Sequence, residues 1–194
     1  MARPKQFDRD AAMKQAMSVF WSKGYAATST DDLLQAMKIG RQSMYDTFGD
    51  KRRLYVEALE RYQMESVAGH VARLRASASP LAGIEALLAG VIAPDKVTRE
   101  MGCMGVGAIC EFGSMDAELA ALRTRSGRLL HKTLTERMQD AQEAGEIAET
   151  VDIACAVRFV EVTMFGLQVA ARAGESARAL RDMAAFAIAR LRNQ

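Results

Sequence analysis

The chain has 194 residues with 49% hydrophobic and 26% charged side chains and a formal net charge of +2 at pH 7, a globular balance that excludes a disordered chain. No stretch approaches the roughly 20 uninterrupted apolar residues of a membrane-spanning helix, and the N-terminal MARPKQFDRD lacks the apolar core of a signal peptide. We therefore expect a cytoplasmic protein.

The spacing of the apolar residues predicts an all-α protein. Only three prolines interrupt the chain, and between the breaks the apolar residues recur at intervals of three and four rather than two. In the N-terminal part, we expect helices from Asp8 or Asp10 to Lys23, from a cap at Thr28 or Ser29 to Met37, from about Arg41 to Phe48, and over about 51 to 77. Gly24 and Gly49 mark helix ends, because glycine readily adopts the backbone that stops a helix.

The rest of the chain continues the same pattern. Ser79 and Pro80 suit the first turn of a helix, and Gly145 and Gly174 suit the ends of two longer helices. The helices expected here cover about 80 to 93, 103 to 112, 115 to 144, 151 to 173 and 176 to 192. The predicted fold class is therefore all-α, with about nine helices.

The stretch IGRQSMYDTFGDK, residues 39 to 51, begins with polar side chains that a core does not require. It overlaps a tight turn over residues 37 to 40, and two short helices joined by such a turn describe a helix-turn-helix, whose second helix enters the major groove of DNA. Arg41, Gln42 and Ser43 then project from the first turn of this reading helix. Arginine can pair with guanine and glutamine with adenine, so we expect these side chains to read base edges.

Other residues of the same stretch have separate roles. Met44 and Phe48 lie one helical turn apart and should pack inward, while the hydroxyl of Tyr45, between the two faces, can reach a phosphate. Lys51 lies at a helix N-terminus, where backbone N–H groups and the ammonium together favour a phosphate.

Residues 1 to 53 carry ten basic and six acidic side chains, a net of +4, whereas the remaining 141 carry sixteen basic and eighteen acidic, a net of −2. This asymmetry fits a small nucleic-acid-binding head on a neutral partner domain.

The segment FWSKGYAATSTDDLLQAMKIGRQSMYDTFGDKRRLY resembles the N-terminal domain of the TetR family of bacterial repressors. The likeness covers about residues 7 to 62 and rests on the Phe-x-x-x-Gly-Tyr run that starts at Phe20, the isoleucine after the turn, the Tyr-x-x-Phe pair and Lys51. It implies a helix-turn-helix DNA-binding domain over residues 1 to 53 and a ligand-binding and dimerisation domain over 54 to 194. The DNA contacts that the resemblance implies come from Thr30, Arg41, Gln42, Ser43, Tyr45, Thr47 and Lys51.

Three positions depart from the family pattern around the reading helix. Lys38 stands where the family has glycine, and a non-glycine residue in a left-handed turn costs on the order of 1 kcal/mol. Leu34 replaces an alanine of the second helix, and Gly40 replaces the Ser or Thr that caps the third helix. We therefore expect a slightly strained turn and a weak cap ahead of Arg41.

The stretch GCMGVGAICEFGSMD resembles a subset of TetR-like regulators that begin the sixth helix with Gly-Cys and place a glutamate eight residues later, here Cys103 and Glu111. Many of those regulators carry asparagine where this chain has Gly107. On one helix, Cys103 and Cys110 would lie roughly 10 Å apart along the axis, too far for a disulfide, and their spacing matches no zinc motif. With Cys155, we expect three free thiols, no metal and no other cofactor.

Two interpretations of these cysteines stay open. They are small buried hydrophobic residues, or Cys103 is a reactive thiol activated by the start of its helix. Methionine and aromatic side chains around it can form an adaptable apolar pocket for a small molecule, although a methionine on a helix is as often part of the core. The residues expected to bind this ligand are Met101, Cys103, Met104, Phe112, Met164 and Phe165, with Met115 as a further candidate.

The last two helices are apolar over wide faces and therefore need cover on more than one side. Their apolar residues are Val157, Val160, Met164, Leu167 and Ala171, then Leu180, Met183, Ala184, Ala187 and Leu191. In the TetR family these two helices pair with their symmetry mates in a four-helix bundle, so the resemblance implies a homodimer through residues 151 to 192. A charge introduced at Leu180 or Met164 is then expected to prevent assembly.

These observations predict a dimeric transcriptional repressor that a small-molecule inducer releases from palindromic or near-palindromic operator DNA. The helix over 51 to 77 would couple the two sites because it belongs to both domains. A repressor that senses oxidants or electrophiles through Cys103 is the alternative. A helical enzyme is disfavoured, because the chain shows no nucleophile–base spacing and its two histidines, His70 and His131, are expected to be solvated or capping. An all-α dimeric adaptor that binds protein instead of DNA stays open.

Overall fold

The computed structural model describes residues 7–192, and within this range it contains ten α-helices and no strand. The helices are α1 (Arg9–Lys23), α2 (Thr30–Met37), α3 (Arg41–Phe48), α4 (Lys51–Arg75), α5 (Pro80–Gly90), α6 (Lys96–Met101), α7 (Met104–Phe112), α8 (Ala117–Glu143), α9 (Ile153–Arg172) and α10 (Ala177–Leu191). The predicted all-α fold is confirmed, and α6 is the helix that the sequence pattern does not separate. This short helix has no buried residue, so it carries no apolar periodicity that would reveal it.

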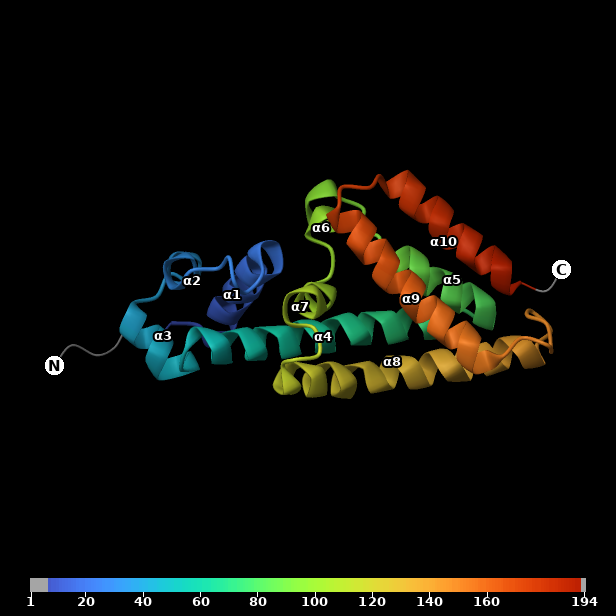
Figure 1. Cartoon of the computed structure of the whole chain (residues 1–194), viewed down its shortest axis with the longest axis horizontal. Coiled ribbons are helices and arrows are strands. Elements are labelled where there is room, and N and C mark those ends of the chain that lie inside the picture. The colour runs from blue at the N-terminus through green and yellow to red at the C-terminus, as the bar shows by residue number, and fades with distance from the viewer. Residues whose placement is uncertain (1–6, 193–194) are drawn as a thin grey trace.

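Helices α1, α2 and α3 and the first half of α4 form a small head around one core (Figure 1). Side chains fix where these helices begin: Asp8 accepts hydrogen bonds from the first backbone N–H groups of α1, and Ser29 and Asp32 form a capping box on α2. The head core includes Met13, Phe20, Leu33, Met44, Phe48, Leu54 and Tyr55. Helix α3 is therefore held by burial of one of its faces.

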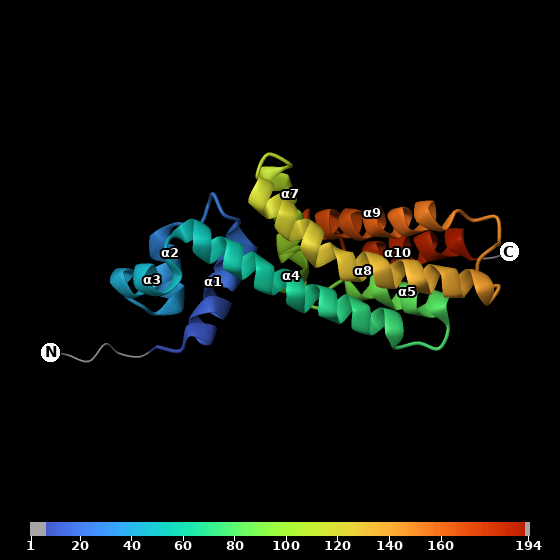
Figure 2. The ribbon, with the colours of Figure 1, turned by 90° about the horizontal axis from the view of Figure 1, so that it is seen from below.

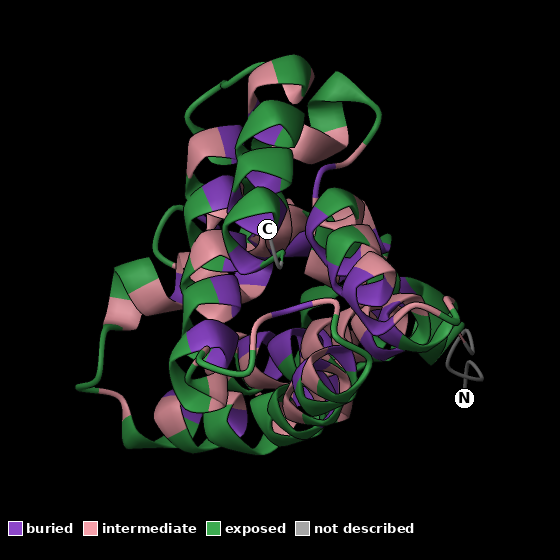
Figure 3. Ribbon diagram, turned by 90° about the vertical axis from the view of Figure 1, so that its right-hand side faces the viewer, coloured by how far each residue is buried: buried purple, intermediate pink, exposed green. Residues whose placement is uncertain are grey.

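The body of the molecule is a bundle in which α5, α8, α9 and α10 pack with the second half of α4 around a second core. Figure 2 shows α8 lying along α4, with α9 and α10 beside them and far from α3. Figure 3 shows buried residues on the inner sides of these helices and exposed residues on the outer sides. Since Leu54 belongs to the head core and Leu74 to the body core, α4 connects the two as one continuous helix.

Helices α9 and α10 each carry two apolar faces. The face that the sequence singles out is buried inside the chain, including Met164, which is 7% exposed, and Leu180, which is 1% exposed; Met183 is the exception at 58%. The second face is exposed and consists of Phe159, Val162, Phe165 and Val169 of α9 and Met183 and Phe186 of α10. A charge at Leu180 or Met164, which was expected to prevent assembly, would therefore also disrupt the core of one chain.

Helix α9 is also, within residues 7–192, the one helix long and apolar enough to cross a membrane by length and composition alone, with a mean hydropathy of 1.5 over 18 residues. The sequence pattern did not predict such a segment. In the structure, α9 packs against α10, α8, α6 and α5, and its inner face belongs to the body core. Helix packing explains the apolar composition of α9, because one of its faces is buried against its own chain while the other face is exposed.

Candidate DNA-binding surface and ligand cavity

The turn before α3 carries the strain and the weak cap that the sequence predicts. Lys38 ends α2 in a left-handed conformation with φ of 56°, and no other non-glycine residue among residues 7–192 has a positive φ. Gly40 caps α3 without a side-chain hydrogen bond. Met44 and Phe48 are buried in the head core, as predicted, and this turns the other faces of α3 outward.

Arg41 and Gln42 project from the exposed start of α3, and a carboxylate holds each of them. Arg41 Nη2 donates to Asp31 Oδ1 on α2 at 2.6 Å, and Gln42 Nε2 donates to Asp46 Oδ1 on α3 at 2.7 Å. Carboxylates on a surface that meets DNA repel phosphates. The two carboxylates are therefore placed to orient the two candidate base-reading side chains, because a hydrogen bond to a charged acceptor restricts the rotamers of the donor.

The other predicted residues of this surface lie on the same two helices. Thr30 is the first residue of α2 and directly precedes Asp31, which contacts α3. On α3, Ser43 and Thr47 are half-buried, and Tyr45 is 43% exposed, between the inner and outer faces as predicted. Thr30, Ser43, Tyr45 and Thr47 thus lie on the two helices that flank the turn over residues 37 to 40.

Lys51, the expected phosphate contact, opens α4 next to the cap formed by Asp50, whose side chain accepts a hydrogen bond from Arg53 N at 2.8 Å. Its Nζ lies 4.3 Å from the centre of the Tyr25 ring, a cation–π distance. The same ring lies 5.5 Å from the ring of Phe112 at the end of α7. The position of Lys51 therefore depends on an aromatic side chain that also contacts the body.

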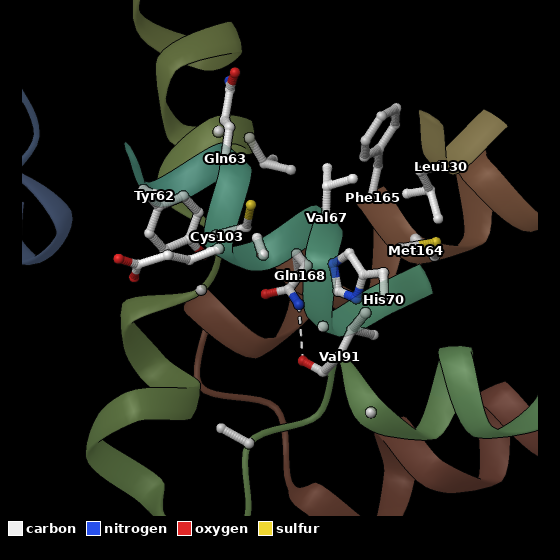
Figure 4. Close-up of a pocket in the computed structure, with 18 of the residues that line it drawn as sticks. Tyr62, Gln63, Val67, His70, Val91, Cys103, Leu130, Met164, Phe165 and Gln168 are labelled. Carbon is white, nitrogen blue, oxygen red and sulfur yellow. Dashed lines mark hydrogen bonds between the residues drawn. The ribbon is translucent and has the colours of Figure 1, made fainter. Parts of the chain in front are cut away.

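A cavity of about 480 Å³ lies between the second half of α4, helices α7, α8 and α9, and the segment between α5 and α6 (Figure 4). Its volume is in the range of small-molecule sites. Its apolar lining includes Val67, Val91, Val106, Ile109, Leu130, Met164 and Phe165. Polar and charged side chains also line it, and one of them, Gln168, donates through Nε2 to the Val91 carbonyl at 2.7 Å (Figure 4).

Half of the predicted ligand residues line this cavity: Cys103, Met164 and Phe165. Met101, Met104 and Phe112 lie outside it, which corrects their assignment to one pocket. Met104 is buried in the head core, Phe112 packs against two tyrosine rings of the head, and Met115 is 92% exposed after α7. Since α7 turns one face to the head and another to the cavity, the methionine content alone does not show which face a residue occupies.

None of the three cysteines is a buried core residue, so the interpretation as small buried hydrophobes is wrong. Cys110 and Cys155 are exposed, Cys103 is half-buried at the cap of α7, and all three are free thiols. Cys103 lies beside the hydroxyl of Tyr62. Burial raises the pKa of Tyr62, and the neighbouring thiol adds to this shift.

His70 is half-buried in the cavity wall, which corrects the expectation of a solvated or capping residue. Burial lowers the pKa of His70 to about 4, and the charge of Arg73 adds to the effect. Arg73 Nη1 lies 3.2 Å from His70 Nδ1, and because a guanidinium only donates, the single proton of the neutral ring is on Nε2. Tyr62 and His70 are eight residues apart, and this spacing is the sequence signal that places the two side chains on one face of α4. His131 is exposed and pairs with a glutamate at 2.8 Å.

Helix α7 connects the cavity wall to the head. Glu111, near its end, accepts hydrogen bonds from the backbone N–H groups of Tyr25 at 3.0 Å and Ala26 at 2.5 Å, in the turn between α1 and α2. Trp21 Nε1 donates to the carbonyl oxygen of Gly102 at 3.0 Å, just ahead of α7. The sequence marks Glu111 by a motif but does not reveal this contact, because Ala26 lies 85 positions away.

Residues 12–58 match the model of a family described as bacterial regulatory proteins, tetR family. The chain is 30% identical over 186 residues to the HTH-type transcriptional repressor ComR of Escherichia coli strain K12, covering 94% of this chain and 88% of ComR. It is 32% identical over 174 residues to the uncharacterized HTH-type transcriptional regulator YezE of Bacillus subtilis strain 168, covering 89% and 90%. Among solved structures, a cysteine-substituted variant of the TetR family transcriptional regulator CifR, complexed with 26-bp double-strand operator DNA, is 29% identical with a TM-score of 0.78 over 97% of this chain and 98% of that one.

Proposed function

The chain belongs to the TetR family of bacterial regulatory proteins, and on this premise we propose that it is a dimeric repressor that a small-molecule inducer releases from palindromic operator DNA. Its relatives are transcriptional regulators and not enzymes. The proposal assigns DNA binding to residues 1–53, ligand binding and dimerisation to 54–194, and action to the cytoplasm.

The observation that carries this proposal is the outer surface of α3, where Arg41 and Gln42 are exposed above the buried Met44 and Phe48. These two side chains supply the hydrogen-bond donors and acceptors that read guanine and adenine in the major groove. Lys51 supplies a charge for the phosphate backbone. The structure of the CifR variant with operator DNA supports double-stranded DNA as the partner of this chain as well.

A homodimer is supported by the exposed apolar face of α9 and α10 that Phe159, Val162, Phe165, Val169, Met183 and Phe186 form. Monomeric proteins rarely expose a contiguous apolar patch of this kind, and a second copy of the same face would cover it. A twofold dimer would present two reading helices to two half-sites, which is why a palindromic operator is part of the proposal.

Release of DNA on ligand binding is supported by the position of the cavity, which lies between the two helices that reach the head. Helix α4 belongs to both cores, and α7 holds the turn between α1 and α2 through Glu111. A ligand that binds one arrangement of α4 and α7 more tightly would shift the head toward the arrangement with lower DNA affinity.

The test is selection of bound DNA from a random pool with the full chain, followed by affinity measurements on the enriched sequence at several salt concentrations. We expect a palindromic site and an affinity that falls steeply with salt, because phosphate contacts release counterions. A pool without any enriched sequence and a shallow salt dependence would favour the protein-binding adaptor instead.

A thiol-based repressor is the second candidate, because Cys103 lines the cavity at the start of α7. Its thiolate would add to an electrophile in the cavity, forming a sulfur–carbon bond, and the added bulk would displace α7. The test is release of DNA by a mild electrophile from the wild type, Cys103→Ser and, as control, Cys110→Ser. Release that is unchanged in Cys103→Ser leaves a non-covalent inducer as the mechanism.

A further inference from the structure

The cavity wall holds charged side chains whose charges do not balance, namely Glu65, Arg73, Arg99, Arg123 and Glu161. The two carboxylates are already engaged, one with Arg61 at 3.0 Å and the other with His131 at 2.8 Å. Among residues 7–192, neither Arg73 nor Arg99 lies within ion-pair distance of a carboxylate. Arg73 and Arg99 therefore place positive charge in the cavity wall that no carboxylate of residues 7–192 balances within ion-pair distance.

Arg73 lies against the end of α5, and Arg99 lies against the short segment that follows it. Arg73 covers Gly90, where a Cβ atom would lie 2.2 Å from the Arg73 Nε. Arg99 Nη1 donates to the carbonyl oxygens of Ala93 at 3.1 Å and Pro94 at 3.2 Å, but its Nε is buried without a hydrogen-bond partner. A buried cationic donor without an acceptor is costly, and an anionic acceptor relieves that cost most effectively.

His70 adds a third donor beside Arg73. Its Nδ1 accepts from the guanidinium, which leaves the Nε2–H of the neutral ring as a donor in the cavity wall. Gln168, fixed by its bond to Val91, offers its Oε1, a single neutral acceptor. Arg73, Arg99 and His70 thus supply three donor groups, two of them cationic, beside the neutral acceptor of Gln168, and Gln63 Oε1 is a further neutral acceptor of the lining.

Another part of the lining is apolar. Val67 of α4, Leu130 of α8, and Met164 and Phe165 of α9 are apolar and come from three different helices (Figure 4). A ligand with a charged group near the arginines would therefore have apolar atoms along the rest of its length.

We propose that the cavity binds an amphipathic organic anion, in which a carboxylate accepts hydrogen bonds from Arg73, His70 and Arg99 and an aliphatic or aromatic body contacts the apolar wall. The inference rests on the proposed inducer site and names the chemical class of its ligand. The carboxylate is preferred over a neutral polar group of the same shape, because arginine–carboxylate hydrogen bonds are charge-assisted.

The experiment measures the affinity of the full-length protein for three matched pairs by calorimetry: octanoate and octanamide, 4-phenylbutanoate and 4-phenylbutanamide, and 2-naphthoate and 2-naphthamide. Each amide keeps the shape of its acid without the charge. We expect the best acid to bind at least about tenfold more tightly than its amide, and Arg73→Met to weaken that acid by about 30-fold or more while changing the amide by less than about twofold. Arg99→Met should lower the same ratio, and Arg128→Met, an exposed arginine of α8 outside the cavity, should not.

The ratio of acid to amide affinity is measured within one variant, so a general loss of stability cancels. Amides that bind as tightly as their acids, acids that do not bind, or an unchanged ratio in both Arg73→Met and Arg99→Met would overturn the inference. The inducer role has a separate readout, the affinity for operator DNA. Acids that bind without changing DNA affinity would contradict the inducer role alone, and amides that release DNA as well as acids would contradict only the ligand class.

Discussion

The exposed ion pair of Arg41 and Asp31 is expected to matter more for DNA binding than for stability. Its side chains are 57% and 81% exposed, and exposed ion pairs contribute roughly 0 to 1 kcal/mol to the free energy of folding. The hydrogen bond instead limits the directions that the Arg41 guanidinium samples. A side chain that is oriented before binding loses less entropy when it pairs with a base.

Replacement of Arg41 by alanine is therefore expected to weaken specific DNA binding by about 1 to 3 kcal/mol and to relax the preference at one base pair per half-site. Lys51→Ala should weaken binding to all sequences alike and reduce the salt dependence, since it removes a phosphate contact. Binding to a panel of single-base operator variants measures both effects, with Lys96→Ala on α6 as the control. An Arg41→Ala protein with unchanged affinity and base preference would exclude the proposed groove entry.

His70 predicts a pH dependence of stability. Its pKa is about 4 in the folded state and 6.5 ordinarily, so between these values the unfolded state binds more protons and the free energy of unfolding falls as the pH drops. The loss amounts to about 2 to 3 kcal/mol below pH 4. Urea unfolding at pH 7 and 4.5 should show a smaller loss for His70→Gln than for the wild type. Equal losses in the two proteins would contradict this assignment.

Helix α7 illustrates how one short element serves two neighbours. Its Met104 side packs into the head core, while Val106 and Ile109 line the cavity. Glu111, at its end, binds two backbone N–H groups that would otherwise be unpaired in the turn after α1. Displacement of α7 by a ligand would therefore act on the head through this carboxylate as well as through α4.

Glu111→Ala should expose the amide hydrogens of Tyr25 and Ala26 to exchange. Loss of each hydrogen bond costs roughly 1 kcal/mol or more, so we expect their hydrogen exchange to accelerate by about tenfold, together with weaker DNA binding. Glu143→Ala, an exposed glutamate at the end of α8, is the matched control. Exchange at both amides that does not change would show that Glu111 does not hold this turn in solution.

The proposed dimer would form through the apolar face of α9 and α10 that remains open in one chain. Val162 and Phe186 are 58% and 57% exposed and lie on the open face, whereas Leu180 is inside the chain. Charges at the open positions test association without removing core contacts. The apolar pattern of the sequence does not distinguish the open face from the core face, because it includes residues of both.

Val162→Glu and Phe186→Glu are expected to give folded monomers that lose operator binding, because burial of a charge in a dimer interface is strongly unfavourable. Sedimentation gives the mass, and circular dichroism gives the helix content. Leu129→Glu, at a residue of α8 that is 50% exposed, controls for the added charge. A wild type that sediments as a monomer at micromolar concentration would refute the dimer.

The sequence by itself determined the all-α class, most helix bounds and the helix-turn-helix, because caps, glycines and three-to-four periodicity act between near neighbours along the chain. The left-handed Lys38 was expected from the family resemblance. Only the tertiary structure decided which face of α9 is covered, that Glu111 binds the turn after α1, and that His70 and Arg73 lie in a cavity wall. These features join side chains far apart in the sequence. Local propensity does not distinguish a helix face that packs within its own chain from one that stays open, because burial of either face gives the same periodic pattern.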